Sequence, residues 1–264
     1  MFTVHTLASG SEGNCLLLST GDTHLLLDAG ISTRRIKTAL SELNLTVDAL
    51  SGILITHEHS DHICGLQTLL KHHAIPLYTG AATARQISYR VAGAEPLLHS
   101  VASGEVFSVG HCRVTAFATS HDAAGSLDYR IDTPSGSFGA ITDTGYVTEE
   151  ARNALKGVEL LLLESNHDVE WLQSGPYPYS LKQRILSDFG HLSNDAAASF
   201  AVEMTRSGTR EIILAHLSRE NNTPARAQET VQRALCAAGL KPRLSVAPRR
   251  ELTRYCVEEC VCRK

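Results

Sequence analysis

The chain has 264 residues, of which 43% are hydrophobic and 20% charged, and its formal net charge is −4. This length and composition suffice for one large α/β domain, so we expect a single domain over residues 1–264. The acidic balance excludes a protein that binds nucleic acid through overall positive charge, although Lys and Arg outnumber Glu in residues 241–264.

The seven cysteines exclude a small disulfide-stabilised scaffold, because they are odd in number and scattered through a long chain. Cys256, Cys260 and Cys262 lie close together but lack the second pair of ligands that a zinc clip requires. We expect these thiols to be reduced and the last few residues to form a flexible tail. No apolar stretch approaches the ~20 residues of a membrane span, and residues 1–5 do not resemble a signal peptide. The sequence therefore predicts a cytoplasmic protein without membrane contact.

The first half of the sequence predicts short strands separated by glycine turns. The predicted strands are residues 2–8, 14–19, 23–28, 53–56 and 75–78. Apolar residues at helical spacing predict two helices, over residues 32–43 and 65–73, and the first of them is capped by Ser32 or Thr33.

The second half also alternates strands and helices. The predicted strands are 105–109, 112–118, 127–132, 137–142, 158–164, 211–215 and 244–247, and the last of these closes the chain. The predicted helices are 148–155, 180–190, 194–207 and 223–239. Two strand-rich halves, each followed by helices, predict an α/β fold with two sheets packed face to face and helices outside, a four-layered αββα sandwich.

The strongest local signal is the sequence His57-Glu58-His59-Ser60-Asp61-His62, which directly follows the apolar strand 53–56. It places four metal-binding side chains in six residues, and imidazole and carboxylate groups suit Zn²⁺ as well as Mn²⁺ or Fe²⁺. A loop can turn this set inward so that His57 and His59 serve one metal and Asp61 and His62 another. The alternative is a His-rich surface loop, which the position after a buried strand disfavours.

The pattern H-x-H-x-D-H resembles the signature of the metallo-β-lactamase superfamily, whose remaining ligands come from single positions at later strand ends. The resemblance assigns His57, His59 and His121 to one metal, Asp61, His62 and His216 to a second, and Asp143 to a position that bridges both. It thereby implies two divalent ions per chain, Zn or Mn. Asp28 matches the family's first motif and would orient the ligand loop by hydrogen bonding. Taken singly, His121, Asp143 and Asp28 also suit ordinary loop, turn or helix-start roles.

Longer segments resemble one branch of this superfamily, the bacterial YycJ/WalJ-type proteins, which are regarded as 5′-to-3′ DNA exonucleases. These segments are residues 7–14, 27–30, 164–168, 190–194 and 216–222. The resemblance implies a metal-dependent phosphodiesterase that uses a metal-bridging hydroxide, with nucleic acid, DNA rather than RNA, as its substrate. The sequence indicates no obligatory protein partner.

Two other classes of function fit parts of the sequence. A small-molecule hydrolase with the same two-metal centre, such as a thioesterase, lactonase or cyclic phosphodiesterase, would suit the acidic net charge. A non-enzymatic metal-binding regulatory protein is disfavoured by the complete ligand set, because a structural zinc site closes with four ligands.

The catalytic residues expected from the resemblance are Asp61, Asp143, Glu164 and His191. By comparison with RNase Z-like nucleases, His191 would contact the scissile phosphate or protonate the leaving oxygen, and Glu164 would tune it. The alternatives are a helix-start turn for His191 and a ligand-orienting carboxylate for Glu164.

Substrate contacts are expected from Ser9 and Asn14 in a glycine-containing turn, from His167, and from Ser193 and Asn194 at a helix start. Tight-turn geometry, a plain loop and an N-cap are the respective alternatives. Contacts with nucleic acid would fall on the rim of the domain, at Arg34, Arg35, Lys37, Lys182, Arg184, Arg219 and the basic C-terminal segment.

Overall fold

The computed structural model describes residues 2–256, and these residues contain two seven-stranded sheets. The first sheet consists of β1 (Phe2–Ala8), β2 (Cys15–Thr20), β3 (Thr23–Leu27), β4 (Gly52–Leu54), β5 (Leu77–Gly80), β6 (Leu98–Val101) and β14 (Thr253–Tyr255). The second consists of β7 (Val106–Val109), β8 (Cys112–Ala118), β9 (Leu127–Thr133), β10 (Gly136–Ile141), β11 (Leu160–Glu164), β12 (Glu211–Ala215) and β13 (Arg243–Val246). The strand orders are β14-β1-β2-β3-β4-β5-β6 and β13-β12-β11-β10-β9-β8-β7.

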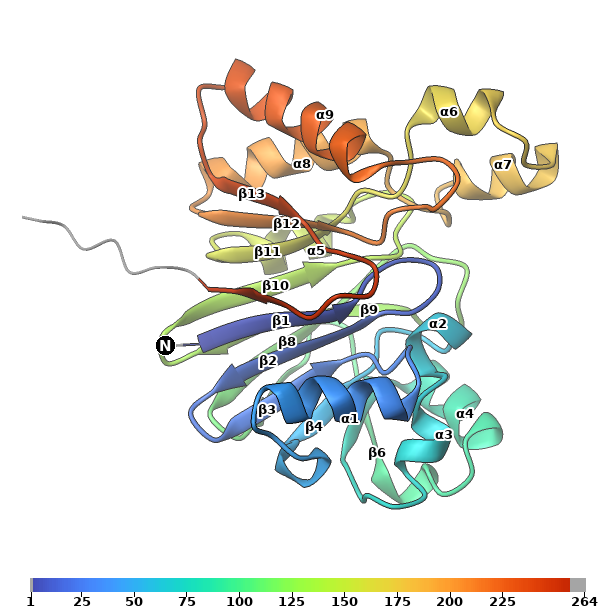
Figure 1. Cartoon of the computed structure of the whole chain (residues 1–264), viewed down its shortest axis with the longest axis vertical. Coiled ribbons are helices and arrows are strands. Elements are labelled where there is room, and N and C mark those ends of the chain that lie inside the picture. Colours follow the sequence, from blue (N-terminus) through green and yellow to red (C-terminus); the bar gives the residue numbers. More distant parts are fainter. Residues whose placement is uncertain (1, 257–264) are drawn as a thin grey trace, which may run out of the picture.

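Helices cover the outer faces of both sheets. The helices of the described residues are α1 (Thr33–Glu42), α2 (Ser60–Ile63), α3 (Leu66–Leu69), α4 (Ala81–Arg90), α5 (Glu149–Leu155), α6 (Val169–Ser174), α7 (Tyr179–Ile185), α8 (Asn194–Arg206) and α9 (Pro224–Ala237), with 3-10 turns at Val47–Ala49 and Glu95–Leu97. Figure 1 shows the two sheets stacked between α1, α3 and α4 on one side and α8 and α9 on the other. The predicted αββα sandwich is therefore confirmed. None of the helices within residues 2–256 is both long and apolar enough to cross a membrane.

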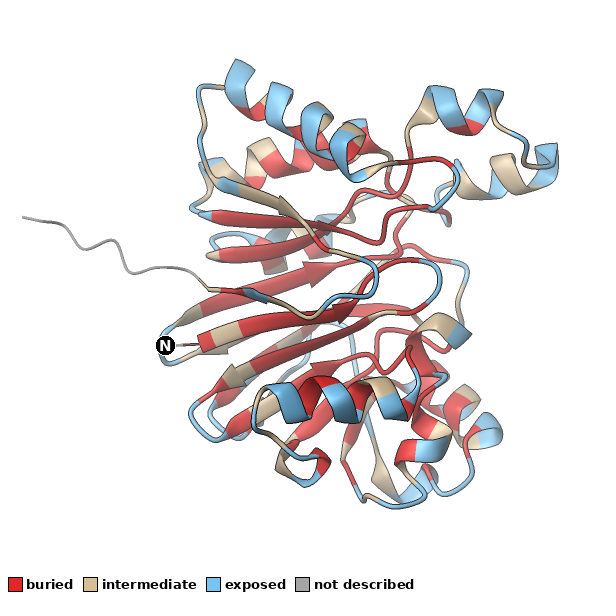
Figure 2. Cartoon of the chain, viewed as in Figure 1, coloured by how far each residue is buried: buried red, intermediate tan, exposed pale blue. Residues whose placement is uncertain are grey.

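The central strands are buried on both faces, which explains their runs of leucine. In β2, Leu16 and Leu18 belong to the core between the sheets, whereas Leu17 packs in a second core with Ile36 and Leu40 of α1. Successive residues of a strand point to opposite faces, so one short segment supplies both cores. Figure 2 shows this burial continuing through both sheets and along the inner sides of the outer helices.

Several helices and strands lie where the sequence predicted none, namely α2, α4, α6, β6 and β14. The reason is clearest in α4, which buries only Thr83, Ala84 and Ile87 and therefore has a weak apolar period. The predicted helix 65–73 is also too long, because α3 ends at Leu69.

The predicted helix 180–190 corresponds to α7, which already ends at Ile185. Beyond it the chain turns back, and the N–H of His191 donates to the carbonyl of Ile185. The turn is tight, since a Cβ at Gly190 would lie 2.1 Å from the same carbonyl oxygen. The prediction of a longer helix was wrong because this turn is needed to bring His191 to the edge of the sheet.

The prediction that strand 244–247 closes the chain was also wrong. After β13 the chain crosses to the other sheet and forms β14, which pairs antiparallel with β1, Val4 opposite Tyr255 and Thr6 opposite Thr253. This short strand covers what would otherwise be the exposed edge β1. The predicted flexible tail, with Cys260 and Cys262, lies outside the described residues.

The direction of the strands determines where functional side chains gather. β3 runs parallel to β4, and β10 runs parallel to β11, which runs parallel to β12. β8 has the same direction as β10 because both are antiparallel to β9. The carboxyl ends of these strands therefore meet at one end of the sandwich, the end where α2 and α7 lie (Figure 1).

Tyr129 of β9 connects the two sheets directly beneath this end. Its buried hydroxyl donates at 2.8 Å to the carbonyl of Ile55, the first residue after β4. We expect Tyr129→Phe to lower the free energy of unfolding by about 1–3 kcal/mol, because it leaves the Ile55 carbonyl buried without this donor. Urea denaturation measures the difference, and Tyr89→Phe, at a side chain 81% exposed, is the matched control. Equal stability of the two variants would contradict this role of the hydroxyl.

Candidate metal centre

The histidine-rich loop after β4 is fixed by backbone hydrogen bonds from neighbouring loops. The N–H of Asn14 donates to the carbonyl of Asp61 at 2.7 Å, and that of Ala29 donates to the carbonyl of His62 at 2.8 Å. A Cβ at Gly30 would lie 1.6 Å from the Asp61 carbonyl oxygen, so only glycine permits this approach. The side chain of Glu58, which is not one of the predicted ligands, accepts a hydrogen bond from the N–H of Ala124. The loop is therefore held in place before any ligand binds.

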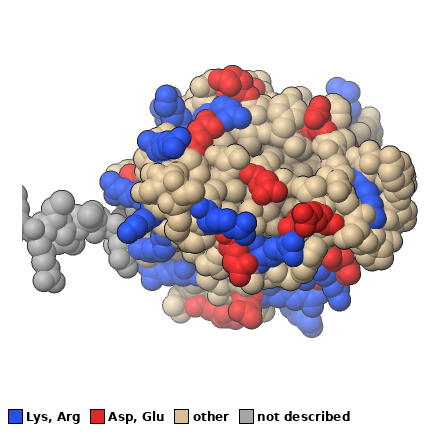
Figure 3. Space-filling model, turned by 90° about the horizontal axis from the view of Figure 1, so that it is seen from above, with Lys and Arg blue, Asp and Glu red and all other residues tan. Residues whose placement is uncertain are grey.

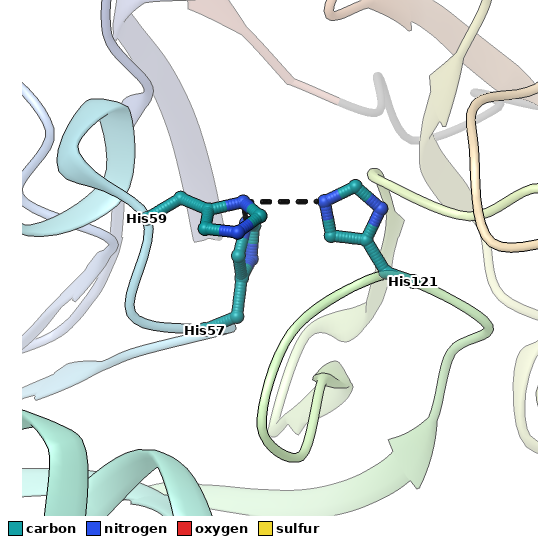
Figure 4. Close-up of side chains that lie close together, drawn as sticks. All are labelled: His57, His59 and His121. Atoms are coloured by element: carbon teal, nitrogen blue, oxygen red, sulfur yellow. Dashed lines mark hydrogen bonds between the residues drawn. The ribbon is translucent and has the colours of Figure 1, made fainter. Parts of the chain in front are cut away.

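Three histidines form the first group of possible metal ligands. His57 Nε2 lies 3.0 Å from His59 Nδ1, which in turn lies 3.3 Å from Nε2 of His121, a residue of the loop after β8. Figure 4 shows the three rings converging from two separate loops. The three ligand nitrogens lie within 4.8 Å of one another, a spacing that allows them to share one cation.

The second group consists of Asp61, His62 and His216, the last of which follows β12. Asp61 Oδ2 lies 3.5 Å from His62 Nε2 and 3.7 Å from His216 Nε2. Asp143 lies between the two groups: its Oδ1 is 3.8 Å from His121 Nε2 and 3.5 Å from His216 Nε2. The structure thus brings together all seven residues that the sequence predicted as metal ligands.

Three of the site residues have left-handed backbone conformations, with φ of 59° at Asp28, 51° at Asp143 and 54° at His216. Such values are uncommon for residues other than glycine and are typically found at functional sites. Each of the three follows the end of a strand, where the chain must turn sharply to aim the side chain into the centre. This shared geometry supports a common function for the three residues.

A buried carboxylate orients a histidine in each half of the site. Asp28 Oδ2 lies 2.7 Å from His62 Nδ1, and Asp28 also accepts the N–H of Thr56 at 2.9 Å. On the other side, Glu164 Oε1 lies 3.1 Å from His216 Nδ1 and 2.7 Å from His191 Nδ1. These contacts direct the opposite nitrogen, Nε2, of His62 and His216 toward Asp61 and Asp143.

The pKa values of the site reflect its burial and its excess of carboxylates. Burial, followed by the charges of His62 and His121, lowers the pKa of His57 well below its usual value. Burial also lowers the pKa of His216, but the charge of Asp143 and the contacts with Asp61 and Glu164 raise it to about 10. His57 is therefore a neutral ligand, whereas a cation at His216 would replace a proton.

The residues present fit divalent cations on further grounds. Asp143 Oδ2 and His216 Nε2 are among the buried polar atoms that have no hydrogen-bond partner within the described residues, and both belong to the groups of possible metal ligands. Buried polar atoms are rarely left unpaired in this way unless an ion or ligand completes the site. Imidazole nitrogens and carboxylate oxygens are common ligands of divalent metals. The cluster can therefore hold divalent metal ions.

Comparison with known proteins agrees with this geometry. Residues 23–217 match the family model of the beta-lactamase superfamily domain. The chain is 39% identical over 232 residues to the exodeoxyribonuclease YycJ of Bacillus anthracis, covering 87% of each chain. It is also 39% identical over 242 residues to the exodeoxyribonuclease WalJ of Streptococcus pneumoniae, covering 90% of each. This chain belongs to the metallo-β-lactamase superfamily.

A solved structure supports the fold of this superfamily member. The metallo-β-lactamase fold protein YhfI from Bacillus subtilis superimposes with a TM-score of 0.71 and covers 96% of this chain and 99% of its own. Its sequence identity is 17%, so this likeness concerns the fold alone.

The predicted substrate residues occupy two different kinds of position. The hydroxyl of Ser9 accepts the backbone N–H of His216 at 2.9 Å, and Asn14 Nδ2 lies 3.0 Å from His62 Nε2. Ser193 caps α8, Asn194 accepts the hydroxyl of Ser165, and His167 is buried. Burial lowers the pKa of His167 to about 4. None of these five is among the described residues that line the pocket above the site, and the substrate role of all five stays a prediction.

The pocket above the metal centre has a volume of about 280 Å³, and its outer wall is a feature that the sequence analysis missed. Tyr177, Leu181, Ile185 and Phe189, from the segment around α7, line it together with His191. Phe189 is 60% exposed, unusually open for a large apolar side chain. The sequence signal that could have indicated this wall is the presence of Tyr177, Tyr179 and Phe189 in the segment before Gly190 and His191.

Replacing Asp28 tests how far metal affinity depends on the carboxylate behind His62. We expect Asp28→Asn to weaken Zn²⁺ or Mn²⁺ binding about 10- to 100-fold, because His62 loses its charged partner while asparagine tolerates the left-handed backbone. Calorimetric titration of metal-depleted protein measures the change. Asp48→Asn is the matched control, since Asp48 Oδ1 also lies 2.7 Å from a histidine, His73, but at the surface. Indistinguishable affinities of the two variants would contradict the assignment.

Proposed function

We propose that this protein is a metal-dependent exodeoxyribonuclease that hydrolyses DNA phosphodiester bonds from a 5′ end. The observation that carries the proposal is the 39% identity, over 87–90% of the chain, to relatives that are named exodeoxyribonucleases. We also infer a cytoplasmic location, which the free thiols support: Cys15, Cys64, Cys112, Cys236 and Cys256.

We assign two divalent ions, Zn or Mn, to the two ligand groups. His57, His59 and His121 would hold one, Asp61, His62 and His216 the other, with Asp143 shared between them. When bound, such ions acidify water and neutralise the charge of a phosphodiester. The placement of Asp143 between the groups, with its two oxygens facing different histidines, supports its assignment as the shared ligand.

His191 is assigned as the proton donor to the leaving oxygen. Glu164 holds its Nδ1 at 2.7 Å, so Nε2 is the nitrogen available to the substrate. The side chain is 22% exposed and lines the pocket, unlike Glu164, which is fully buried behind it. Burial lowers the pKa of His191, but the charge and hydrogen bond of Glu164 reverse this and raise it. A protonated imidazole facing the pocket suits general-acid catalysis near neutral pH.

The walls of the pocket suit a nucleotide. Tyr177 and Phe189 offer aromatic surface on which a base can stack, an interaction that tolerates any base sequence. Ser11 and Ser218 line the same pocket and supply hydroxyl groups for the sugar–phosphate chain. Planar apolar surface beside a polar metal-binding floor supports a nucleic-acid substrate over a small ester.

A substrate panel tests the proposed activity. The protein loaded with Zn²⁺ or Mn²⁺ is incubated with 5′-phosphorylated duplex DNA, single-stranded DNA, RNA and a thioester. We expect stepwise release of nucleotides from DNA and its loss in Asp61→Ala and Asp143→Ala, since each removes a proposed metal ligand. Turnover of the thioester without release of nucleotides would instead show a small-molecule hydrolase, and full activity of Asp143→Ala would contradict the shared-ligand assignment.

A second variant separates proton donation from metal binding. We expect His191→Gln to lower kcat about 10²- to 10⁴-fold, the usual contribution of a general acid, while metal content measured by elemental analysis stays at the wild-type level. Lys156→Gln, at an exposed residue beyond α5, is the control for purification and handling. A wild-type kcat in His191→Gln would rule out this role.

A further inference from the structure

A second, smaller pocket adjoins the metal centre. It is formed by the turn Ser9–Gly13 and by Leu217, which follows the ligand His216. Ser11 lines both this pocket and the larger one above the metal centre, so the two are neighbours. The small pocket therefore lies beside the pocket above the metal centre.

Arginines supply most of the charge of this small pocket. Its charged lining residues are Arg35, Arg219, Arg249, Arg250 and Glu12. We call it the arginine pocket. Its four guanidinium groups come from three parts of the chain, and Glu12 is the one carboxylate among the described lining residues. Arg219 also lies 3.8 Å from Glu220, and positive charge is still in excess. A concentration of charge next to a reaction centre favours an anionic group of the substrate.

The guanidinium groups are already positioned for an anion. Arg249 donates to the carbonyl of Ser218 at 3.1 Å, and Arg35 donates to the carbonyl of Leu7 at 3.3 Å. Each uses one of its five N–H donors in these contacts and keeps others for a ligand. Backbone anchoring of this kind lowers the conformational entropy that binding would cost.

Glu12 shows that the other two arginines converge on one negative group. Its two carboxylate oxygens accept from Arg219 at 3.0 Å and from Arg250 at 2.7 Å. Both arginine side chains stay largely exposed, 66% for Arg219 and 70% for Arg250, so most of their donors remain accessible. The two arginines are thus placed to bind an oxyanion between them, and they have more N–H donors than the carboxylate of Glu12 uses.

The size of the arginine pocket restricts what can enter. Its volume is about 40 Å³, which is space for about three water molecules. A tetrahedral anion fits this space, whereas a base with its sugar requires the larger neighbouring pocket of about 280 Å³.

Charge elsewhere on the molecule is arranged differently. Figure 3 views the molecule from above, over α8 and α9, and shows Lys and Arg interspersed with Asp and Glu on that face. The mixture of both signs on that face contrasts with the arginine pocket, whose charged lining residues are four arginines and one glutamate.

We propose that the arginine pocket binds the terminal 5′-phosphate of a DNA strand while the adjacent phosphodiester lies over the metal centre. This inference rests on the exonuclease function proposed above. A terminal phosphate carries about −1.5 to −2 charges at pH 7 and three acceptor oxygens, whereas an internal phosphodiester carries one charge. The excess of guanidinium groups matches the terminal group, because Arg binds phosphate oxygens in a bidentate manner. The pocket would then select chain ends over internal sites.

Binding and hydrolysis of two matched oligonucleotides test the proposal. The oligonucleotides share one sequence and differ only in carrying a 5′-phosphate or a 5′-hydroxyl group. Affinities are measured by fluorescence anisotropy with metal-depleted protein, and kcat/KM is measured with metal-loaded protein. We expect the 5′-phosphorylated strand to bind at least about tenfold more tightly, and Arg219→Gln and Arg250→Gln each to remove most of that preference, in line with charged hydrogen bonds.

Arg233→Gln, at an exposed arginine of α9, is the control and should keep the wild-type preference. Equal binding of the two oligonucleotides by the wild type would overturn the proposal. An equal loss of affinity for both oligonucleotides in the arginine variants would also overturn it, because such a loss would show that these arginines contact internal phosphates. The anisotropy measurement does not depend on catalysis. A preference for the 5′-phosphorylated strand without hydrolysis of DNA would therefore overturn the proposed nuclease activity but not the proposed role of the arginine pocket.

Discussion

Negative charge buried where the two sheets meet is the constraint on which this molecule depends. Asp28, Asp143 and Glu164 are at most 2% exposed, and each ends or follows a strand of the sandwich. Burying a carboxylate costs several kcal/mol unless hydrogen bonds or a cation compensate it. Asp28 and Glu164 are compensated largely within the protein, through Thr56 and the histidines beside them. Asp143 Oδ2 has no hydrogen-bond partner among the described residues, and we propose that a cation shared between the ligand groups would complete its environment.

The two halves of the centre have the same construction. In the first sheet a carboxylate behind the ligands, Asp28, holds His62. In the second sheet another, Glu164, holds His216 and extends to His191. Asp143 lies between them, so the position of the shared ligand depends on how the two sheets pack. Fold stability and metal affinity are therefore expected to be coupled, as metal binding and folding commonly are.

The sequence predicted the parts of the site that are local or lie at strand ends. His57 to His62 form one uninterrupted motif after an apolar strand, and Asp143 and His216 directly follow strands that apolar runs identify. The shared direction of these strands explains why the residues that follow them lie close together at one end of the sandwich. The alternation of leucines in β2 likewise made the two-sided burial of the sheets predictable.

Features that depend on tertiary contacts could not be predicted from the sequence. β14 is three residues long and carries Arg254, and it is a strand only because β1 offers an edge for pairing. The family resemblance linked Glu164 with His191, but the second contact of Glu164, with His216, joins residues that no local pattern connects. The arginine pocket is similar, since its guanidinium groups come from α1 and from the two loops that follow β12 and β13.

Anomalous diffraction from crystals grown with Zn²⁺ tests the central claim most directly. The account predicts two anomalous peaks, one bonded to nitrogens of His57, His59 and His121 and one bonded to Asp61, His62 and His216, with Asp143 in contact with both. Bond lengths of ~2.0–2.2 Å to nitrogen and oxygen are expected. A single peak, or peaks bound to other side chains while these ligands remain free, would contradict it.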